Sequence, residues 1–231
     1  MFRKLTLALS VAFLLLLASP SVASAATIWD LATDWSDSAN PNGPWAYRQG
    51  SNALPALAAG GWGPGTQPGN FLPFWAKASA DNVAGYQTGD IIVHSVDGQN
   101  GNPSLGEANV AWTSPISGVI DISGFAFYSQ FPLGRSNDFT LMLNSTVLAT
   151  GTVSSTNGYD RSNPLQFAAT GVAVSAGDVV QLVFHRTPGQ SDGSIAGVGL
   201  TITQTVPEPA LASLLAAGSL ALVGLRSRTT R

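Results

Sequence analysis

The chain has 231 residues, enough for one large β domain or two small ones. Only 10% of the residues are charged, against about 25% in an average soluble protein, which argues against a disordered polyelectrolyte, a coiled coil and a nucleic-acid-binding protein. Aromatic residues make up 9% and include six Trp, so a substantial core can be built. The absence of Cys excludes disulfides, thiolate metal sites and a Cys nucleophile.

Residues 1–25 have the three parts of a secretory signal peptide. A basic start is followed by an apolar run over 5–18 and by the small residues Ala23 and Ala25. The apolar run is too short to span a membrane comfortably. The pattern predicts export and cleavage by signal peptidase between Ala25 and Ala26.

Residues 26–205 form the predicted mature domain, long enough to bury about 70% of its unfolded surface in one core. Alternating apolar and polar residues recur through its second half, separated by Gly, Asn and Asp turns, without a helical pattern. This pattern predicts an all-β fold, a single antiparallel β-sandwich of the jelly-roll kind. The predicted strands are Val119–Tyr128, Phe139–Leu143, Thr146–Thr152, Val180–His185 and Ile195–Thr203.

The first part of this domain, Thr27–Asp90, is less regular. It is rich in Gly and Pro, which favour loops. Five of the six Trp also lie here, so the segment is expected to be ordered. We expect loops pinned by tryptophans over one sheet rather than a second domain.

The C-terminal segment 206–231 also has three parts. Pro207-Glu208-Pro209 precedes an uncharged apolar run over 210–225, and Arg226, Arg228 and Arg231 end the chain. Sixteen residues at about 1.5 Å each give a helix of about 24 Å, short for a hydrocarbon core of about 30 Å. The arginines favour a cytoplasmic C-terminus. The segment predicts a weak transmembrane helix over 210–225, and an ordinary single-pass anchor is the alternative.

This three-part tail, combined with a signal peptide, resembles the PEP-CTERM sorting signal of Gram-negative bacteria, over Val206–Arg231. The resemblance implies processing by an exosortase, a membrane transpeptidase-like enzyme, near Pro207-Glu208-Pro209. It further implies transient anchoring in the inner membrane and a final place at the cell surface or in the extracellular matrix of an exopolysaccharide-producing bacterium.

The mature domain is similar to a β-sandwich module found in secreted bacterial proteins with such tails. The resemblance rests on four motifs, and the module has no established catalytic residues to carry over. Ala111 stands where many members of the family have Arg. The four motifs are Asn40–Tyr47, Ala108–Pro115, Gly118–Phe125 and Ala176–Val180.

Catalytic groups are scarce in the mature domain, so no catalytic residue is nominated and the protein is not expected to be an enzyme. The two histidines, His94 and His185, lie far apart in the sequence and at strand-like positions, and no Gly-x-Ser-x-Gly elbow is present. Glu107 is the only Glu of the mature domain, so no carboxylate pair for glycoside hydrolysis stands out.

No cofactor or metal site is nominated either. The run Asp97–Asn102 is rich in oxygen donors, which leaves a structural calcium open. However, Ala108 stands at the twelfth position, where an EF-hand needs an acidic ligand, and a solvated turn is the favoured interpretation.

Two functions remain. The first is an exported, non-enzymatic surface or matrix protein whose partners are signal peptidase and an exosortase. The alternative is a carbohydrate-binding module for exopolysaccharide, in which exposed aromatic faces stack on sugar rings. The aromatic candidates in or beside loops are Trp45, Tyr47, Trp62 and Trp75; their alternative role is to form the N-terminal core.

Overall fold

The computed structural model describes residues 25–58, 60–65, 72–83, 85–98 and 101–205, and the fold is that of the unit Thr27–Thr205. The predictions for Ala23, Pro207-Glu208-Pro209, Arg226, Arg228 and Arg231 lie outside the described residues. Among the described residues, no helix is long and apolar enough to cross a membrane.

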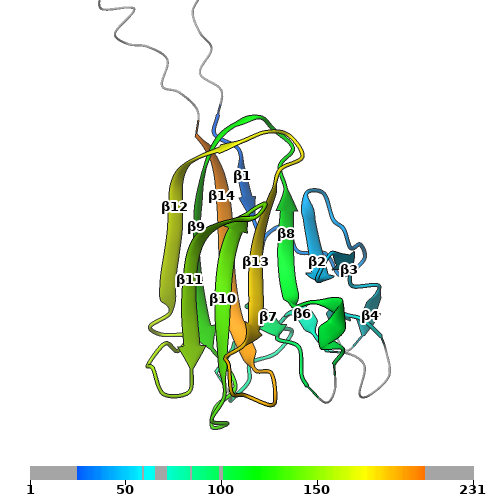
Figure 1. Ribbon diagram of the computed structural model, residues 1–231, viewed down its shortest axis with the longest axis vertical. Helices are drawn as coiled ribbons and strands as arrows, with labels where there is room; N and C mark the ends of the chain where they lie inside the picture. Colours follow the sequence, from blue (N-terminus) through cyan, green and yellow to red (C-terminus); the bar gives the residue numbers. More distant parts are fainter. Residues whose placement is uncertain (1–24, 59, 66–71, 84, 99–100, 206–231) are drawn as a thin grey trace, which may run out of the picture. The chain divides into compact units, whose positions relative to one another are not determined.

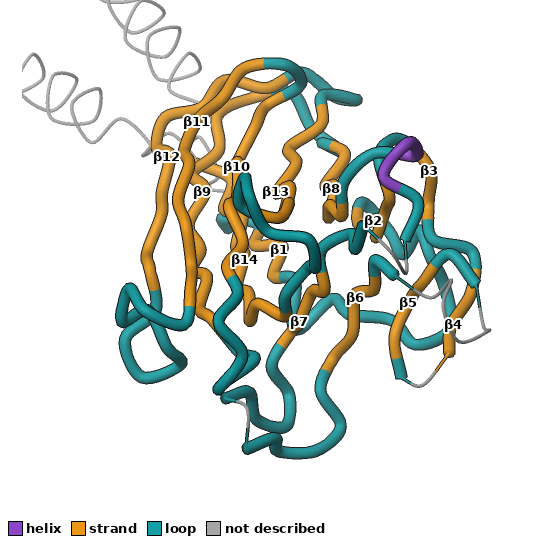
Figure 2. The backbone as a smooth tube through the Cα atoms, turned by 60° about the horizontal axis from the view of Figure 1, so that its bottom comes forward, coloured by secondary structure: helices purple, strands orange, loops and turns teal. Residues whose placement is uncertain are grey.

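The unit is a sandwich of two antiparallel sheets that contain all fourteen described strands (Figure 1). The only described helix is the short 3-10 turn η1, Pro103–Leu105, drawn purple in Figure 2. The prediction of an all-β antiparallel sandwich is therefore confirmed.

The first sheet has eight strands, with β14 near its centre. β14 is long and pairs with β9, with β7 and, close to its C-terminal end, with β1. The strand order is β12 (Leu165–Val174), β9 (Gly118–Tyr128), β14 (Ile195–Thr205), β7 (Ile91–His94), β6 (Phe74–Lys77), β5 (Gly61–Gly63) and β4 (Ala56–Ala58), and β1 (Ile28–Asp30) lies outside this path.

The second sheet has six strands. Its order is β11 (Thr146–Ser154), β10 (Ser136–Leu143), β13 (Val179–Arg186), β8 (Ala108–Thr113), β2 (Trp45–Gln49) and β3 (Asn52–Ala53).

All five strands predicted from alternation are present, each extended by a few residues at most. The expectation for Thr27–Asp90 is corrected. Instead of loops over one sheet, this segment supplies short strands to both sheets, β1 and β4 to β6 to the first and β2 and β3 to the second. These strands have two to five residues, too few for an alternating pattern to stand out among the Gly and Pro.

The core between the sheets is built around large aromatic side chains. Trp45, Trp75 and Trp112 are fully buried. The ring of Trp75 makes an edge-to-face contact with Phe184, which belongs to the other sheet, with 6.2 Å between the ring centroids. Rings in this geometry attract each other beyond the area that they bury. The core therefore joins the two sheets through residues from both halves of the sequence.

The two ends of the unit lie side by side. Ile28 pairs with Thr203, and the amide of Gln204 donates to the carbonyl of Thr27 at 2.8 Å. The first strand of the domain therefore closes onto the last one.

We expect Trp112→Ala to lower the free energy of unfolding by about 3–5 kcal/mol, because the change removes a fully buried ring. The ring also packs edge to face on Trp29, with centroids 5.0 Å apart. Chemical denaturation of the variant measures the loss. The control is Val147→Ala, at a strand position that is 55% exposed, which should change little; equal midpoints for the two variants would contradict this packing.

Candidate functional site

The four aromatic residues proposed from the sequence as sugar platforms lie inside the domain. Trp45, Tyr47 and Trp75 have no exposed surface, and Trp62 is 7% exposed. Two of the indole nitrogens are also occupied: that of Trp45 donates to Asp34 Oδ2 at 3.0 Å and that of Trp62 to the carbonyl of Ser36 at 2.8 Å. Burial, with Asp34 and Asp37 nearby, raises the pKa of Tyr47 far above its usual value. The sugar-stacking interpretation of these residues is therefore corrected: they form the core.

A different aromatic pair lies on the outer face of the eight-stranded sheet. Along β9, Ala126 and Tyr128 belong to the inter-sheet core, whereas Phe125 and Phe127 alternate with them and point to the opposite side. The two rings are stacked, with centroids 6.2 Å apart and planes 20° from parallel. Phe127 is buried, but Phe125 keeps part of its surface exposed.

Glycines of the neighbouring strand make room for these rings. Phe125 pairs with Gly199 of β14 and Phe127 with Gly197, and a Cβ atom at either glycine would overlap the ring opposite. Gly in the middle of a strand often marks such a close approach. The Phe125 ring therefore rests on the backbone of β14.

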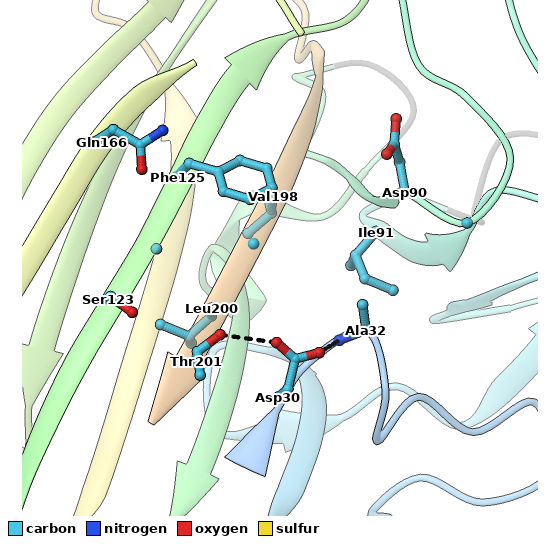
Figure 3. A pocket seen from close by; sticks show the side chains of 13 residues that line it. Asp30, Ala32, Asp90, Ile91, Ser123, Phe125, Gln166, Val198, Leu200 and Thr201 are labelled. Atoms are coloured by element: carbon cyan, nitrogen blue, oxygen red, sulfur yellow. Dashed lines mark hydrogen bonds between the residues drawn. The ribbon is translucent and has the colours of Figure 1, made fainter. Parts of the chain in front are cut away.

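A hollow of about 240 Å³ opens beside this ring (Figure 3). Two rows of paired residues cross it. One row contains Gln166, Phe125 and Gly199, and the next contains Ser123, Thr201 and Asp30. Asp90, just before β7, lines the side opposite Gln166 (Figure 3). The register of four strands thus brings together residues that are far apart in the sequence.

The carboxylate of Asp30 is held in place at one end of the hollow. Its Oδ1 accepts from the amides of Ala32 at 3.1 Å and Thr33 at 2.9 Å, and its Oδ2 accepts from the hydroxyl of Thr201 at 2.8 Å. Partial burial raises the pKa of Asp30, but these hydrogen bonds outweigh burial and hold the pKa below its usual value. The ionised Asp30 therefore stabilises the folded state above about pH 4, and this stabilisation is lost as the pH falls through the lower pKa that Asp30 has in the folded state.

Asp90 is paired with Arg161, which precedes β12 on the far side of β9 and β14. The guanidinium donates to both carboxylate oxygens, at 2.7 and 3.1 Å, and the hydrogen bond to Asp90 raises the pKa of Arg161. The pair therefore crosses two strands of the sheet.

Two polar side chains in the hollow are free to bind a ligand. Ser123 and Gln166 are both exposed, and within the described part of the chain neither side chain has a hydrogen-bond partner. Together they offer a hydroxyl group and an amide, which donate and accept.

The two histidines lie in different sheets. His94 of β7 is 5% exposed, its Nδ1 lies 2.7 Å from the carbonyl of Ser95, and burial lowers its pKa. His185 of β13 is on the six-stranded sheet, with Nε2 3.8 Å from Asp138 Oδ2. Neither residue lines the hollow.

The oxygen-rich run Asp97–Asn102 is partly described. Asp97 is buried and its Oδ1 accepts from the amide of Gly193, while Asn102 Oδ1 accepts from the amide and the hydroxyl of Ser104. Gln99 and Asn100 lie outside the described residues. In the described ranges, no group of three or more His, Cys, Asp or Glu side chains could hold a metal ion.

No protein-family model matches the chain, and no curated protein matches it. Several solved carbohydrate-binding modules are similar to it in fold. The CBM22-1 xylan-binding domain of Paenibacillus barcinonensis Xyn10C is 11% identical, with 80% of this chain and 99% of that chain covered and a TM-score of 0.40. CBM51 from Clostridium perfringens GH95, in complex with methyl-galactose, is 12% identical, with 76% of this chain and 99% of that chain covered and a TM-score of 0.36. Likenesses this distant carry no conclusion about a ligand.

We expect Gly199→Ala to push the Phe125 ring off its seat and to cost about 1–3 kcal/mol of stability, as overpacking does. The matched control is Gly134→Ala, whose Cβ would meet nothing within 4 Å. Denaturation midpoints of both variants, and of Gly199→Ala combined with Phe125→Ala, measure the effect. Gly199→Ala should cost much less stability in a protein that already carries Phe125→Ala than in the wild type. An equal cost in both backgrounds would contradict the contact between the ring and Gly199.

Proposed function

We propose that the chain is an exported, non-enzymatic protein that binds polysaccharide in the hollow beside Phe125. The observation that carries this proposal is a partly exposed ring, fixed on the glycine backbone of β14, next to unused polar groups. Aromatic rings present a negative face to positively polarised hydrogens, and the C–H groups of a pyranose face supply these. A fixed ring adds little ordering cost on binding.

The polar groups around the ring suit the hydroxyl groups of a sugar. Ser123 and Gln166 can each donate and accept, and the carboxylates of Asp30 and Asp90 can accept further hydrogen bonds. The volume of about 240 Å³ is below the roughly 300–1,000 Å³ of pockets for drug-sized molecules. It therefore suits one sugar unit of a longer chain that continues along the surface.

Export and sorting form the second part of the proposal. They rest on the sequence of residues 1–25 and 206–231, with Ala26 as the first mature residue and Pro207-Glu208-Pro209 as the stretch that an exosortase reads. A polysaccharide ligand fits this destination, since a surface or matrix protein meets exopolysaccharide outside the cell.

We expect Phe125→Ala to weaken binding to soluble polysaccharide about tenfold, which corresponds to about 1.4 kcal/mol. The probes are a β-glucan, a mannan, a galactan and the exopolysaccharide of the producing cell, and titration calorimetry gives Kd. Phe131→Ala is the matched control, since it removes a ring that is 38% exposed on the loop after β9. Phe125→Trp should keep the affinity. Equal Kd values for wild type and Phe125→Ala would rule out the ring as a platform.

We also expect the surface-localised protein to lack Arg231, because the segment 210–225, for which the sequence predicts a short helix, is proposed as a temporary anchor. Mass spectrometry of the mature protein measures its C-terminus. Glu208→Ala should leave uncut protein in the inner membrane, whereas Thr229→Ala should be processed normally. An intact C-terminal Arg231 on the surface form would refute the sorting proposal.

A further inference from the structure

We infer that the hollow beside Phe125 selects uncharged sugars, or sugars that carry an amine, and discriminates against uronic acids and other acidic sugars. This inference rests on the proposed function and specifies its ligand class. It follows from the charges and the hydrogen-bonding groups that line the hollow.

The charged residues that line the hollow are two carboxylates, Asp30 and Asp90. The pKa of Asp30 lies below its usual value, so this group is ionised at neutral pH. Each carboxylate keeps one oxygen that can accept a further hydrogen bond, because Asp30 Oδ2 and Asp90 Oδ1 accept one each, whereas the other oxygen of each already accepts two. The lining is therefore acceptor-rich, and Asp30 gives it a negative charge that no ion pair of the described residues neutralises, whereas Asp90 is paired with Arg161.

Two cations hydrogen bond to residues that line the hollow. Arg161 donates through two nitrogens to Asp90, at 2.7 and 3.1 Å, and the Lys77 ammonium donates to the carbonyl of Ala32 at 2.8 Å. Neither cation is among the residues that line the hollow. An incoming carboxylate would therefore lose hydration and have to compete with Asp90 or with the carbonyl of Ala32 for a cationic partner.

The net charge of the whole domain is also negative. Of the 13 acidic residues only Glu208 lies outside it, and of the 10 basic residues only five remain within it, which leaves 12 acids against 5 bases and a net charge of −7. This field repels an acidic polymer at low ionic strength, and salt screens it over about 10 Å at 0.1 M.

Hydrogen bonding favours the same ligands. A sugar hydroxyl can donate to an ionised carboxylate, and such charge-assisted bonds are stronger than neutral ones. Oxidising a hydroxymethyl group to a carboxylate replaces a donor with a group that only accepts. A neutral or amine-bearing sugar can therefore satisfy Asp30 and Asp90, and a uronate cannot.

The test compares polymers that share one backbone. The exported protein is titrated with the neutral β-glucan, mannan or galactan that binds best, with the same polymer oxidised to carboxylates at C6, and with its 6-amino derivative. At low salt we expect the oxidised polymer to bind at least about tenfold more weakly than the neutral one, and added salt to narrow the gap. The amine should bind at least as tightly as the neutral polymer. An oxidised polymer that binds equally or more tightly at low salt would overturn the inference and leave the proposed function standing, whereas no binding of any polymer would overturn both.

A pair of isosteric variants locates the discrimination. Asp90→Asn removes one charge from the hollow and releases Arg161, whereas Asp178→Asn removes one charge at the turn before β13. The ratio of the two Kd values, oxidised over neutral, should fall in Asp90→Asn and stay near wild type in Asp178→Asn. Equal falls in both variants would assign the effect to net charge and overturn the assignment to the hollow.

Discussion

The packing of aromatic side chains between the two sheets is the interaction on which the rest of the structure depends. The chain has no Cys and therefore no disulfide to supplement it. Trp45 and Trp112 pair directly across β2 and β8, and Trp75 reaches Phe184 from the opposite sheet. Because these rings come from both halves of the domain, the short N-terminal strands are stable only when packed on the long C-terminal ones. The tryptophans that looked available for a ligand are thus committed to folding.

β14 connects this core to the proposed site. Its residues alternate between Val198, Leu200 and Ile202, which belong to the core, and Gly199 and Thr201, which line the hollow on the outer face. The two glycine positions lack a side chain where the phenylalanines of β9 cover the strand. One strand therefore holds the sandwich together with one set of residues and shapes the binding surface with the other.

The sequence was sufficient for five of the six strands of eight or more residues and insufficient for the site. Alternation marks Val119–Tyr128, because Ile120, Ile122, Ala126 and Tyr128 share one face and the polar residues Asp121 and Ser123 lie on the other. β12 was missed because its Ala, Thr and Gly residues give little contrast between faces. The hollow depends on the register between β9 and β14, and no local pattern encodes the pairing of Phe125 with Gly199. A signal was nevertheless present: two outward phenylalanines in one strand, and two glycines at the same spacing in another.

The adjacency of Thr27 and Gln204 has a mechanical consequence. A load applied at Thr205 enters the fold along the axis of β14, which is hydrogen bonded to β9 over ten paired positions and to β1 beside its end. Such a pull shears many hydrogen bonds together instead of opening them one after another. A polymer held at Gly199 and Phe125 would pull against the same two strands, so tension between ligand and chain end would bypass the six-stranded sheet. Force between the proposed ligand and Thr205 would therefore pass along a short path of β9, β14 and β1, inside the eight-stranded sheet.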